Sequence, residues 1–164
     1  MILVVDDDDQ VRSVLTRILE SHDYECRAAP SVEAARADLA DPECALVLCD
    51  VMMRRESGFD LLREVRVDHP DLPVVMVSGV TDPSLASLAL ELGAYGYVTK
   101  PFDANQVLIA VANALRHAEL EIENESYRMH LEELVDERTK ELRAALAELS
   151  AAQPPEASRT DDHT

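Results

Sequence analysis

Short apolar runs alternate along the chain with segments in which apolar residues recur every three or four positions. The apolar runs predict five strands, over 2–6, 24–29, 45–50, 72–79 and 95–101. The segments with helical spacing predict helices over 10–22, 31–40, 59–68, 82–93 and from 103 onward. Runs that are apolar throughout are typical of strands buried on both faces. The alternation therefore predicts an α/β fold with a parallel sheet and helices on both of its faces.

The predicted helix ends carry local signals that support this division. Asp8 and Asp9 are expected to open the first helix, because a carboxylate is favourable at the positive end of a helix. Ser31 is expected to cap the second helix. Pro83 stands at the first position of the fourth helix, and Gly93 lies just beyond its end.

Polar side chains stand at the ends of four predicted strands. They are Asp6 and Asp7, Asp50, Ser78 and Lys100. Ligands bind beyond the carboxyl ends of the strands in such sheets, so we expect these side chains to share one rim. Two carboxylates about 4 Å apart repel by roughly 1 kcal/mol in water and about 4 kcal/mol at an effective dielectric of 20. Three carboxylates at one rim offer only oxygen ligands, and they therefore favour a hard cation, Mg²⁺ or Mn²⁺.

The same set of side chains suits phosphoryl transfer. A carboxylate can form an aspartyl-phosphate, while the metal and Lys100 balance the phosphoryl charge and Ser78 donates a hydrogen bond. Taken singly, each residue has a simpler interpretation. An aspartate after a strand is more often a helix cap, a lone lysine is a solvated charge, and a lone serine is a satisfied loop hydroxyl. Their joint occurrence at four strand ends favours the phosphoryl-transfer site.

Five segments resemble, in order, the response-regulator receiver domain of two-component systems. They are VVDDD at 4–8, LVLCDVMM at 46–53, SGFDLL at 57–62, PVVMVSG at 73–79 and GAYGYVTKPF at 93–102. The resemblance covers residues 1–118 and implies a flavodoxin-like, doubly wound, five-stranded parallel sheet with strand order 2-1-3-4-5. It also implies that Asp50 accepts a phosphoryl group from the phosphohistidine of a sensor histidine kinase or phosphotransfer protein.

The resemblance implies roles for the other residues of the rim. The metal ligands would be Asp6, Asp7, Asp50 and the backbone carbonyl of Met52. Lys100, before a cis bond to Pro101, would pair with the phosphoryl group. Ser78 and Tyr97 would be switch residues that remodel the face formed by helix 4, strand 5 and helix 5. An aromatic residue in a strand is otherwise usually part of the core, which is the simpler interpretation of Tyr97.

The chain departs from the family pattern near the predicted phosphorylation site. Arg54 stands where proline is common and adds a cation near the acidic residues, and Gly79 stands where alanine is frequent. Met52 and Val80 flank the site, and neither can hydrogen-bond an attacking water, so we expect slow self-dephosphorylation. Beyond its own phosphotransfer and this slow loss, the protein is expected not to be an enzyme.

The fifth helix is expected to continue past the receiver, because no proline or glycine interrupts residues 103–150. Residues at spacings of three and four recur in its distal part: Leu131, Val135, Arg138, Leu142, Ala145 and Leu149. This predicts a coiled-coil extension over 119–150 and a homodimer, weakened by Arg138. The alternative is a solvated helix. Residues 151–164 are polar and broken by prolines, which predicts a disordered tail. No helix-turn-helix or second catalytic motif follows, which leaves either a shortened chain or a receiver acting through protein contacts.

Composition and net charge limit the classes of molecule that the chain is expected to bind. The chain of 164 residues carries a net charge of -18, which argues against binding nucleic acid or an anionic membrane. No apolar stretch approaches the ~20 residues that span a bilayer, and the N-terminus lacks the basic segment of a signal peptide. We therefore expect a cytoplasmic protein. Its three cysteines lack a C-x-x-C pair, which predicts reduced structural thiols.

Three other functions remain as alternatives. An aspartate-nucleophile phosphatase would have a D-x-D-x-[TV] loop after the first strand, but Gln10 occupies the Thr/Val position. A flavin-binding protein of the same fold would need a loop that offers N–H groups to phosphate, and the aspartates would repel that phosphate. An inert structural dimeriser would not need Asp7, Asp50, Ser78 and Lys100 together.

Overall fold

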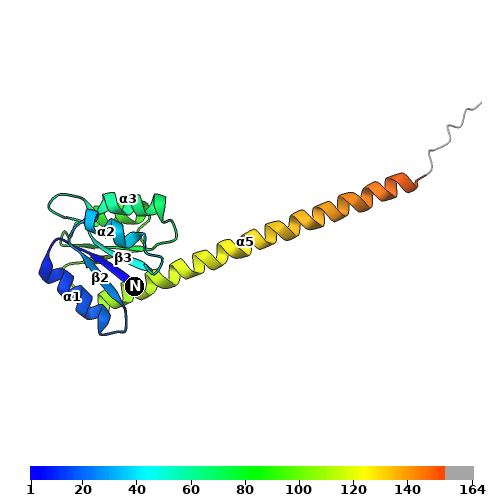
Figure 1. Ribbon diagram of the computed structural model, residues 1–164. Helices are drawn as coiled ribbons and strands as arrows, with labels where there is room; N and C mark the ends of the chain where they lie inside the picture. Colours follow the sequence, from blue (N-terminus) through cyan, green and yellow to red (C-terminus); the bar gives the residue numbers. More distant parts are fainter. Residues whose placement is uncertain (154–164) are drawn as a thin grey trace, which may run out of the picture. The chain divides into compact units, whose positions relative to one another are not determined.

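The computed structural model describes residues 1–153, in two units that comprise residues 1–122 and the residues from Glu123 onward. Five strands alternate with five helices along the chain (Figure 1). The strands are β1 (Ile2–Val5), β2 (Cys26–Ala29), β3 (Leu46–Asp50), β4 (Val74–Ser78) and β5 (Gly96–Thr99). The helices are α1 (Asp9–Glu20), α2 (Val32–Leu39), α3 (Gly58–Asp68), α4 (Pro83–Glu91) and α5 (Ala104–Ala152).

The five strands form one parallel sheet in the order β2-β1-β3-β4-β5. This confirms the predicted flavodoxin-like fold and strand order. Val5 pairs with Cys49, Asp50 pairs with Val77, and the last residues of β4 and β5 pair with each other. The register therefore brings the carboxyl ends of β1, β3, β4 and β5 to one edge of the sheet.

The core consists of two clusters, one on each face of the sheet. Side chains of α2, α3 and α4 pack on one face, and those of α1 and α5 pack on the other. Figure 1 shows α2 and α3 above the sheet and α1 below it. Every residue of β1, β3 and β4 is buried, which explains why their sequences are apolar throughout. The edge strand β2 has two exposed residues.

The predicted helix caps are present. The carboxylate of Asp8 accepts hydrogen bonds from the N–H groups of Gln10 and Val11, and Asp9 is the first residue of α1. The Ser31 hydroxyl caps α2 by accepting from the N–H of Ala34. Pro83 begins α4, and Gly93 beyond its end has a φ of 96°, a conformation that favours glycine.

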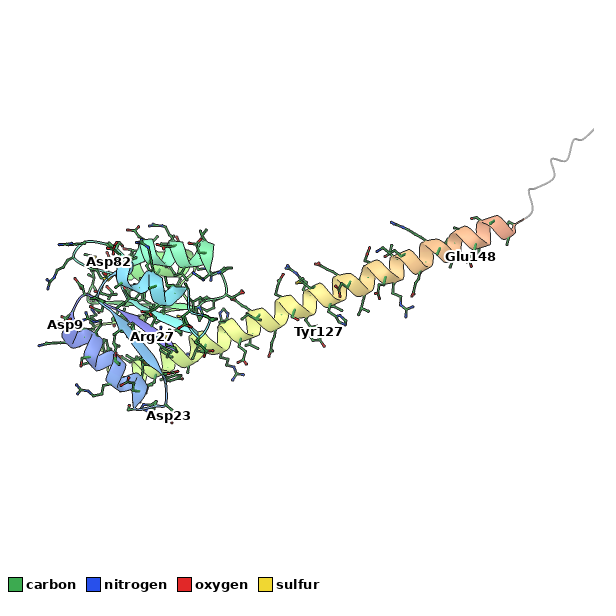
Figure 2. All side chains as sticks on the ribbon, in the orientation of Figure 1. Asp9, Asp23, Arg27, Asp82, Tyr127 and Glu148 are labelled. Carbon is green, nitrogen blue, oxygen red and sulfur yellow. The ribbon has the colours of Figure 1, made fainter. Side chains whose placement is uncertain are left out.

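Helix α5 is a single helix of 49 residues. Its buried side chains are confined to the part that packs on the sheet, and they are Val107, Val111, Ala114 and Ala118. From residue 119 to residue 153 every side chain is exposed, including Tyr127 and Glu148 (Figure 2). The predicted tail from residue 151 is helical at Ala151 and Ala152, and its residues 154–164 lie outside the described residues. Within the described part of the chain, no helix is long and apolar enough to cross a membrane.

Gly58, the first residue of α3, lies against the backbone of Asp50. Its N–H donates a hydrogen bond to the carbonyl oxygen of Val51 at 2.9 Å, which holds the start of α3 next to the end of β3. A Cβ atom at Gly58 would lie 2.0 Å from the carbonyl oxygen of Asp50. Only glycine fits here without moving the backbone that carries Asp50.

We expect Gly58→Ala to lower the free energy of unfolding by about 3 kcal/mol or more, because the added methyl group must displace main-chain atoms of Asp50. Urea denaturation measures this loss. Gly79→Ala is the matched control, since the nearest atom to its Cβ would be Cδ of Lys100 at 4.0 Å. Its effect should stay within about 0.5 kcal/mol. Equal losses for the two variants would contradict the steric explanation.

Candidate functional site

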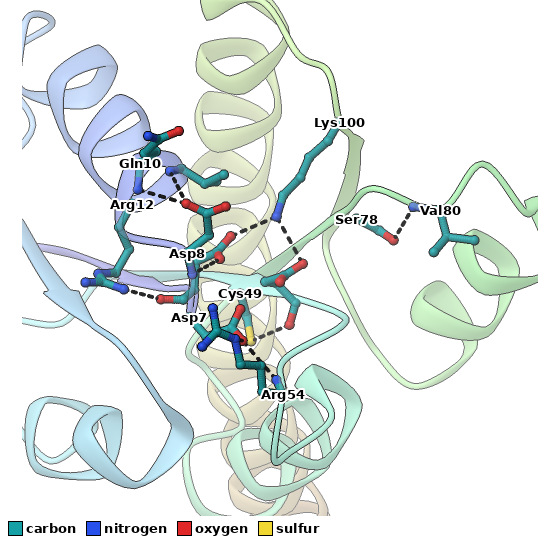
Figure 3. Close-up of polar contacts among 12 residues, drawn as sticks. Asp7, Asp8, Gln10, Arg12, Cys49, Arg54, Ser78, Val80 and Lys100 are labelled. Atoms are coloured by element: carbon teal, nitrogen blue, oxygen red, sulfur yellow. Dashed lines mark hydrogen bonds and ion pairs between the residues drawn. The ribbon is translucent and has the colours of Figure 1, made fainter.

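The polar side chains predicted to share a rim lie at the carboxyl edge of the sheet (Figure 3). Asp6 directly follows β1, Asp50 ends β3, and Ser78 ends β4. These three are the polar or charged residues that are buried within the described part of the chain. Lys100 directly follows β5. The rim is thus built by strand ends, and its polar groups are largely shielded from water.

Three carboxylates meet at this rim. One oxygen from each of Asp6, Asp7 and Asp50 lies within 4.8 Å of the other two. The Asp6 and Asp50 residues are 1% and 4% exposed, and Asp7 is half-buried. An oxygen-only donor set of this kind fits a hard divalent cation. The structure therefore brings together the three carboxylates that the sequence analysis proposed as metal ligands.

Lys100 contacts both buried carboxylates. Its Nζ donates a hydrogen bond to Oδ2 of Asp6 at 2.9 Å and lies 3.3 Å from Oδ1 of Asp50. The bond between Lys100 and Pro101 is cis, as expected. Burial alone would lower the pKa of Lys100, but the hydrogen bond to Asp6 and the attraction of both carboxylates outweigh it and raise that pKa. Lys100 is therefore a permanent positive charge in the site.

Asp50 is in the opposite electrostatic situation. Burial raises its pKa above the ordinary value, the charge of Asp6 raises it further, and Lys100 opposes both effects. The preceding residue, Cys49, is fully buried, and burial raises the pKa of its thiol strongly. Its Sγ donates to the backbone oxygen of Asp50 at 3.4 Å. Cys49 therefore stays a protonated thiol, as the prediction of structural thiols requires.

Asp7 is held by the loop between β3 and α3. The backbone N–H of Arg54 donates to Oδ2 of Asp7 at 2.9 Å, and Nε of Arg54 lies 3.7 Å from the same oxygen (Figure 3). In the same loop, the Met52 side chain is 64% exposed, so the role proposed for this residue rests on its backbone carbonyl alone. The position of Arg54 in the sequence predicts a cation near the acidic residues, but no sequence signal predicts the main-chain hydrogen bond.

Arg12 is a residue of the site that sequence reasoning missed. Its Nη1 donates to the carbonyl oxygen of Asp6 at 2.7 Å, and its guanidinium also pairs with Asp9. The N–H of Asp8 donates to Oδ1 of Asp6 at 2.9 Å. These contacts fix the loop that carries Asp6 and Asp7. The i, i+3 spacing of Asp9 and Arg12 on a helix was the available signal.

Within residues 1–153, neither the Ser78 hydroxyl nor the Tyr97 hydroxyl is hydrogen-bonded to a carboxylate of the rim. The hydroxyl of Ser78 accepts from the N–H of Val80 at 3.1 Å, and the Ser78 carbonyl accepts from the N–H of Lys100 at 2.7 Å. Tyr97 packs half-buried against the cluster on the α3 face, and its hydroxyl has no hydrogen-bond partner within residues 1–153. Their roles as switch residues stay predictions.

Comparison with known proteins gives consistent results. The family model "Response regulator receiver domain" matches residues 2–112. The nitrogen assimilation regulatory protein NtrX of Azorhizobium caulinodans is 34% identical over 116 residues, which are 70% of this chain and 26% of NtrX. The DNA-binding transcriptional regulator NtrC of Rhizobium meliloti is 37% identical over 114 residues, 70% of this chain and 24% of NtrC. This chain thus matches about a quarter of the length of these two relatives.

Solved structures agree with this comparison. The receiver domain of NtrX from Brucella abortus is 36% identical, with a TM-score of 0.68, and the match covers 71% of this chain and 98% of that one. A longer NtrX from the same organism, in complex with ADP, has a TM-score of 0.71 and 35% identity. That match covers 77% of this chain and 28% of the NtrX chain.

The expectation that this protein is not an enzyme is wrong as it stood. NtrX from Brucella abortus has been crystallised in complex with ADP and with ATP. A segment similar to this chain is therefore found in proteins that bind nucleotides. The receiver motifs say nothing about the activity of residues outside the segment that they cover. The relative NtrC is named as a DNA-binding regulator. The absence of a nucleic-acid partner therefore stays a prediction for residues 1–164.

The raised pKa of Asp50 predicts that its ionised carboxylate destabilises the fold. The folded protein keeps the Asp50 proton to a higher pH than the unfolded chain does. The loss of folding stability therefore grows as pH rises from the ordinary pKa to the raised pKa, and it vanishes below about pH 4. Asp50→Asn should therefore raise the Tm by a few degrees at about pH 7 and lose this advantage at about pH 4. Thermal melts with a chelator present measure both.

Asp71→Asn is the control for this experiment, because Asp71 is exposed in a loop. Its Tm should follow that of the wild-type protein at both pH values. If Asp50→Asn instead melted below the wild-type protein at neutral pH, Lys100 and the local hydrogen bonds would outweigh the cost of burying the charge.

Proposed function

Because this chain belongs to the response regulator receiver domain family, we propose that it accepts a phosphoryl group on Asp50 from the phosphohistidine of a sensor histidine kinase or phosphotransfer protein. The chain is the receiver domain of a two-component response regulator, with residues 1–118 as the proposed domain. The observation that carries the proposal is the rim itself, where Asp50 lies between an ammonium group and two further carboxylates.

The chemistry follows from the positions of these groups. A Mg²⁺ or Mn²⁺ held by Asp6, Asp7, Asp50 and the Met52 carbonyl would supply positive charge to the phosphoryl oxygens. A carboxylate oxygen of Asp50 forms the new bond to phosphorus as the N–P bond of the phosphohistidine breaks, and the electron pair of that bond returns to the imidazole. Lys100, 3.3 Å from Asp50, balances the charge that arrives.

Phosphorylation would change the partners of Lys100 first. The phosphoryl group carries a charge of nearly −2 and replaces the single negative charge of the buried Asp50 carboxylate, and it competes with Asp6 for the ammonium group. Ser78 accepts from Val80 and so keeps its own hydroxyl proton available for a phosphoryl oxygen. The N–H of Lys100 is bonded to the Ser78 carbonyl, so both residues would move together. Tyr97, whose hydroxyl lacks a partner within residues 1–153, is the proposed responder in β5.

Tyr95 offers a route from β5 to α5. Its ring meets the His117 ring edge-on with 5.2 Å between centroids, and the Arg66 guanidinium lies 5.8 Å from the Tyr95 ring centre. Its hydroxyl donates to Glu121. Tyr95 immediately precedes β5, while His117 and Glu121 belong to α5. We propose that a displacement of β5 reaches α5 through this contact, within the face formed by α4, β5 and α5.

The distal part of α5 is the proposed dimer interface, with a second copy of this chain as its partner. Its exposed apolar side chains lie at helical spacings of one, three, four and seven, and they are Leu131, Leu134, Val135, Leu142, Leu146 and Leu149. Each is 43% to 65% exposed. All of these side chains except Leu149 line one shallow groove, which Arg138 also lines. A helix in a protein gains most of its stability by packing such a stripe against another element. The stripe therefore supports a coiled coil over 119–150.

Acetyl phosphate with Mg²⁺ tests the central proposal. The wild-type chain should gain about 80 Da, the mass of one phosphoryl group on a carboxylate, as measured by mass spectrometry of the intact protein. Asp50→Asn should abolish the gain. Asp71→Asn removes an exposed carboxylate that precedes β4, at the opposite end of that strand from Ser78, and should leave the gain unchanged. A mass gain that persists in Asp50→Asn would refute Asp50 as the acceptor.

Arg138 provides a test of the dimer. Its guanidinium bonds Glu141 of its own helix at 2.8 Å, and it occupies a position of the apolar stripe where an apolar residue would pack better. Arg138→Leu should therefore tighten the dimer about tenfold or more. Sedimentation equilibrium or sizing chromatography, with and without beryllofluoride, measures the dissociation constant.

Lys140→Leu is the control for this test, because it adds the same apolar residue but lies outside the stripe. It should leave the dissociation constant within about twofold of the wild-type value. Equal tightening in both variants would indicate nonspecific association. A protein that stays monomeric with Arg138→Leu would contradict the proposed interface.

A further inference from the structure

We propose that Arg54 acts as a built-in counter-cation for Asp7 and so weakens the affinity of the rim for its divalent cation. The inference rests on the proposed function, because it takes Asp7 to be a metal ligand. It begins from two contacts to one atom. The N–H of Arg54 donates to Oδ2 of Asp7 at 2.9 Å, and Nε lies 3.7 Å from the same oxygen.

Both contacts depend on the residue type at position 54. A proline there would have no N–H and no positive charge, so Asp7 would lose both partners. With arginine, Oδ2 of Asp7 is already engaged by a hydrogen bond and faces a cation. A divalent ion that approaches Asp7 therefore meets a positive charge at Oδ2, and it binds against that charge, binds the other oxygen or displaces the guanidinium.

Together, the two cationic side chains contact all three carboxylates of the rim. Lys100 contacts Asp6 and Asp50, and Arg54 contacts Asp7. The mutual repulsion that would otherwise draw in a divalent cation is thus already reduced by the protein. Lys100 belongs to the family pattern that this chain resembles, whereas Arg54 departs from it.

The effect should be modest and sensitive to salt, because the Arg54 side chain is 88% exposed. Exposed ion pairs of this kind change affinities by a factor of about two to five, and added salt screens them. Arg54 lines a surface pocket together with Asp7, Ser31 and Glu56, so the guanidinium has space beside Asp7 in which to move when a cation binds. Arg54 therefore tunes the affinity of the site and does not block it.

Titration of the full chain with Mg²⁺ alone tests the inference without any phosphorylation. We expect Arg54→Gln, which keeps the N–H and removes the charge, to lower the Kd for Mg²⁺ about two- to fivefold. Isothermal titration calorimetry gives the Kd, and amide chemical shifts of residues 50–54 confirm the location. The gain should shrink between about 0.05 M and 0.5 M salt.

Arg55→Gln is the matched control. Arg55 is the next residue, is exposed and carries the same charge, but of the two arginines Arg54 is the one that contacts Asp7. Its Kd should change less than that of Arg54→Gln. Melting curves without Mg²⁺ show that each variant is folded before the titration.

The outcomes separate the inference from the proposed function. Equal Kd values for the wild-type protein and Arg54→Gln, weaker binding by Arg54→Gln, or equal tightening by both glutamine variants would each overturn the inference, while the proposed function would stand. If neither the wild-type protein nor any variant bound Mg²⁺ at residues 50–54, the proposed function itself would fail, and the inference with it.

Discussion

The ammonium group of Lys100 lies 2.9 Å from a carboxylate oxygen of Asp6 and 3.3 Å from one of Asp50, and the carboxyl edge of the sheet depends on this triad. Two buried carboxylates side by side are costly, because each loses its hydration and each repels the other. One ammonium group offsets part of both costs. Lys100 directly follows β5 and is 94 residues from Asp6 along the chain, so the triad depends on the sheet bringing the ends of β1, β3 and β5 to one edge.

The loop between β3 and α3 is held on several sides around this triad. Gly58 packs against the backbone of Asp50, and Arg54 is bonded to Asp7. The carboxylate of Glu56 accepts from the N–H of Val32 at 3.1 Å, which ties the loop to the start of α2. These contacts fix the main chain next to Asp50 while leaving the side chain of Arg54 exposed. The loop thus combines a main chain held by several contacts with an exposed charge at Arg54.

Much of the fold could be predicted from sequence because its signals are strong and local. The runs 2–6 and 45–50 are apolar because β1 and β3 are buried on both faces, and Asp8 and Ser31 mark helix starts by bonding to the next turn. The shared position of the polar side chains at the rim could be predicted from the ends of the predicted strands alone. The start of β2 at Cys26, two residues later than predicted, was harder, because exposed residues on an edge strand weaken the apolar signal.

Other features of the site depend on tertiary contacts that spacing does not reveal. No pattern shows that the N–H of Arg54 reaches across 47 residues to Asp7, or that Arg12 supports the carbonyl of Asp6. The hydroxyl of Ser78 turns to Val80 because the loop brings that N–H within 3.1 Å. The classification as a non-enzyme failed for a different reason, since the segment that matches the relatives is only about a quarter of their length.

The burial of Cys49 has a chemical consequence for its neighbour. An aspartyl-phosphate is a mixed anhydride, and a thiolate adjacent to it could attack the acyl carbon and release phosphate as a thioester formed. Cys49 is fully buried, its thiol pKa is raised by that burial, and its Sγ is directed at a main-chain oxygen. The residue beside the acceptor is thereby kept non-nucleophilic, so the high-energy bond on Asp50 would be protected from its nearest competitor.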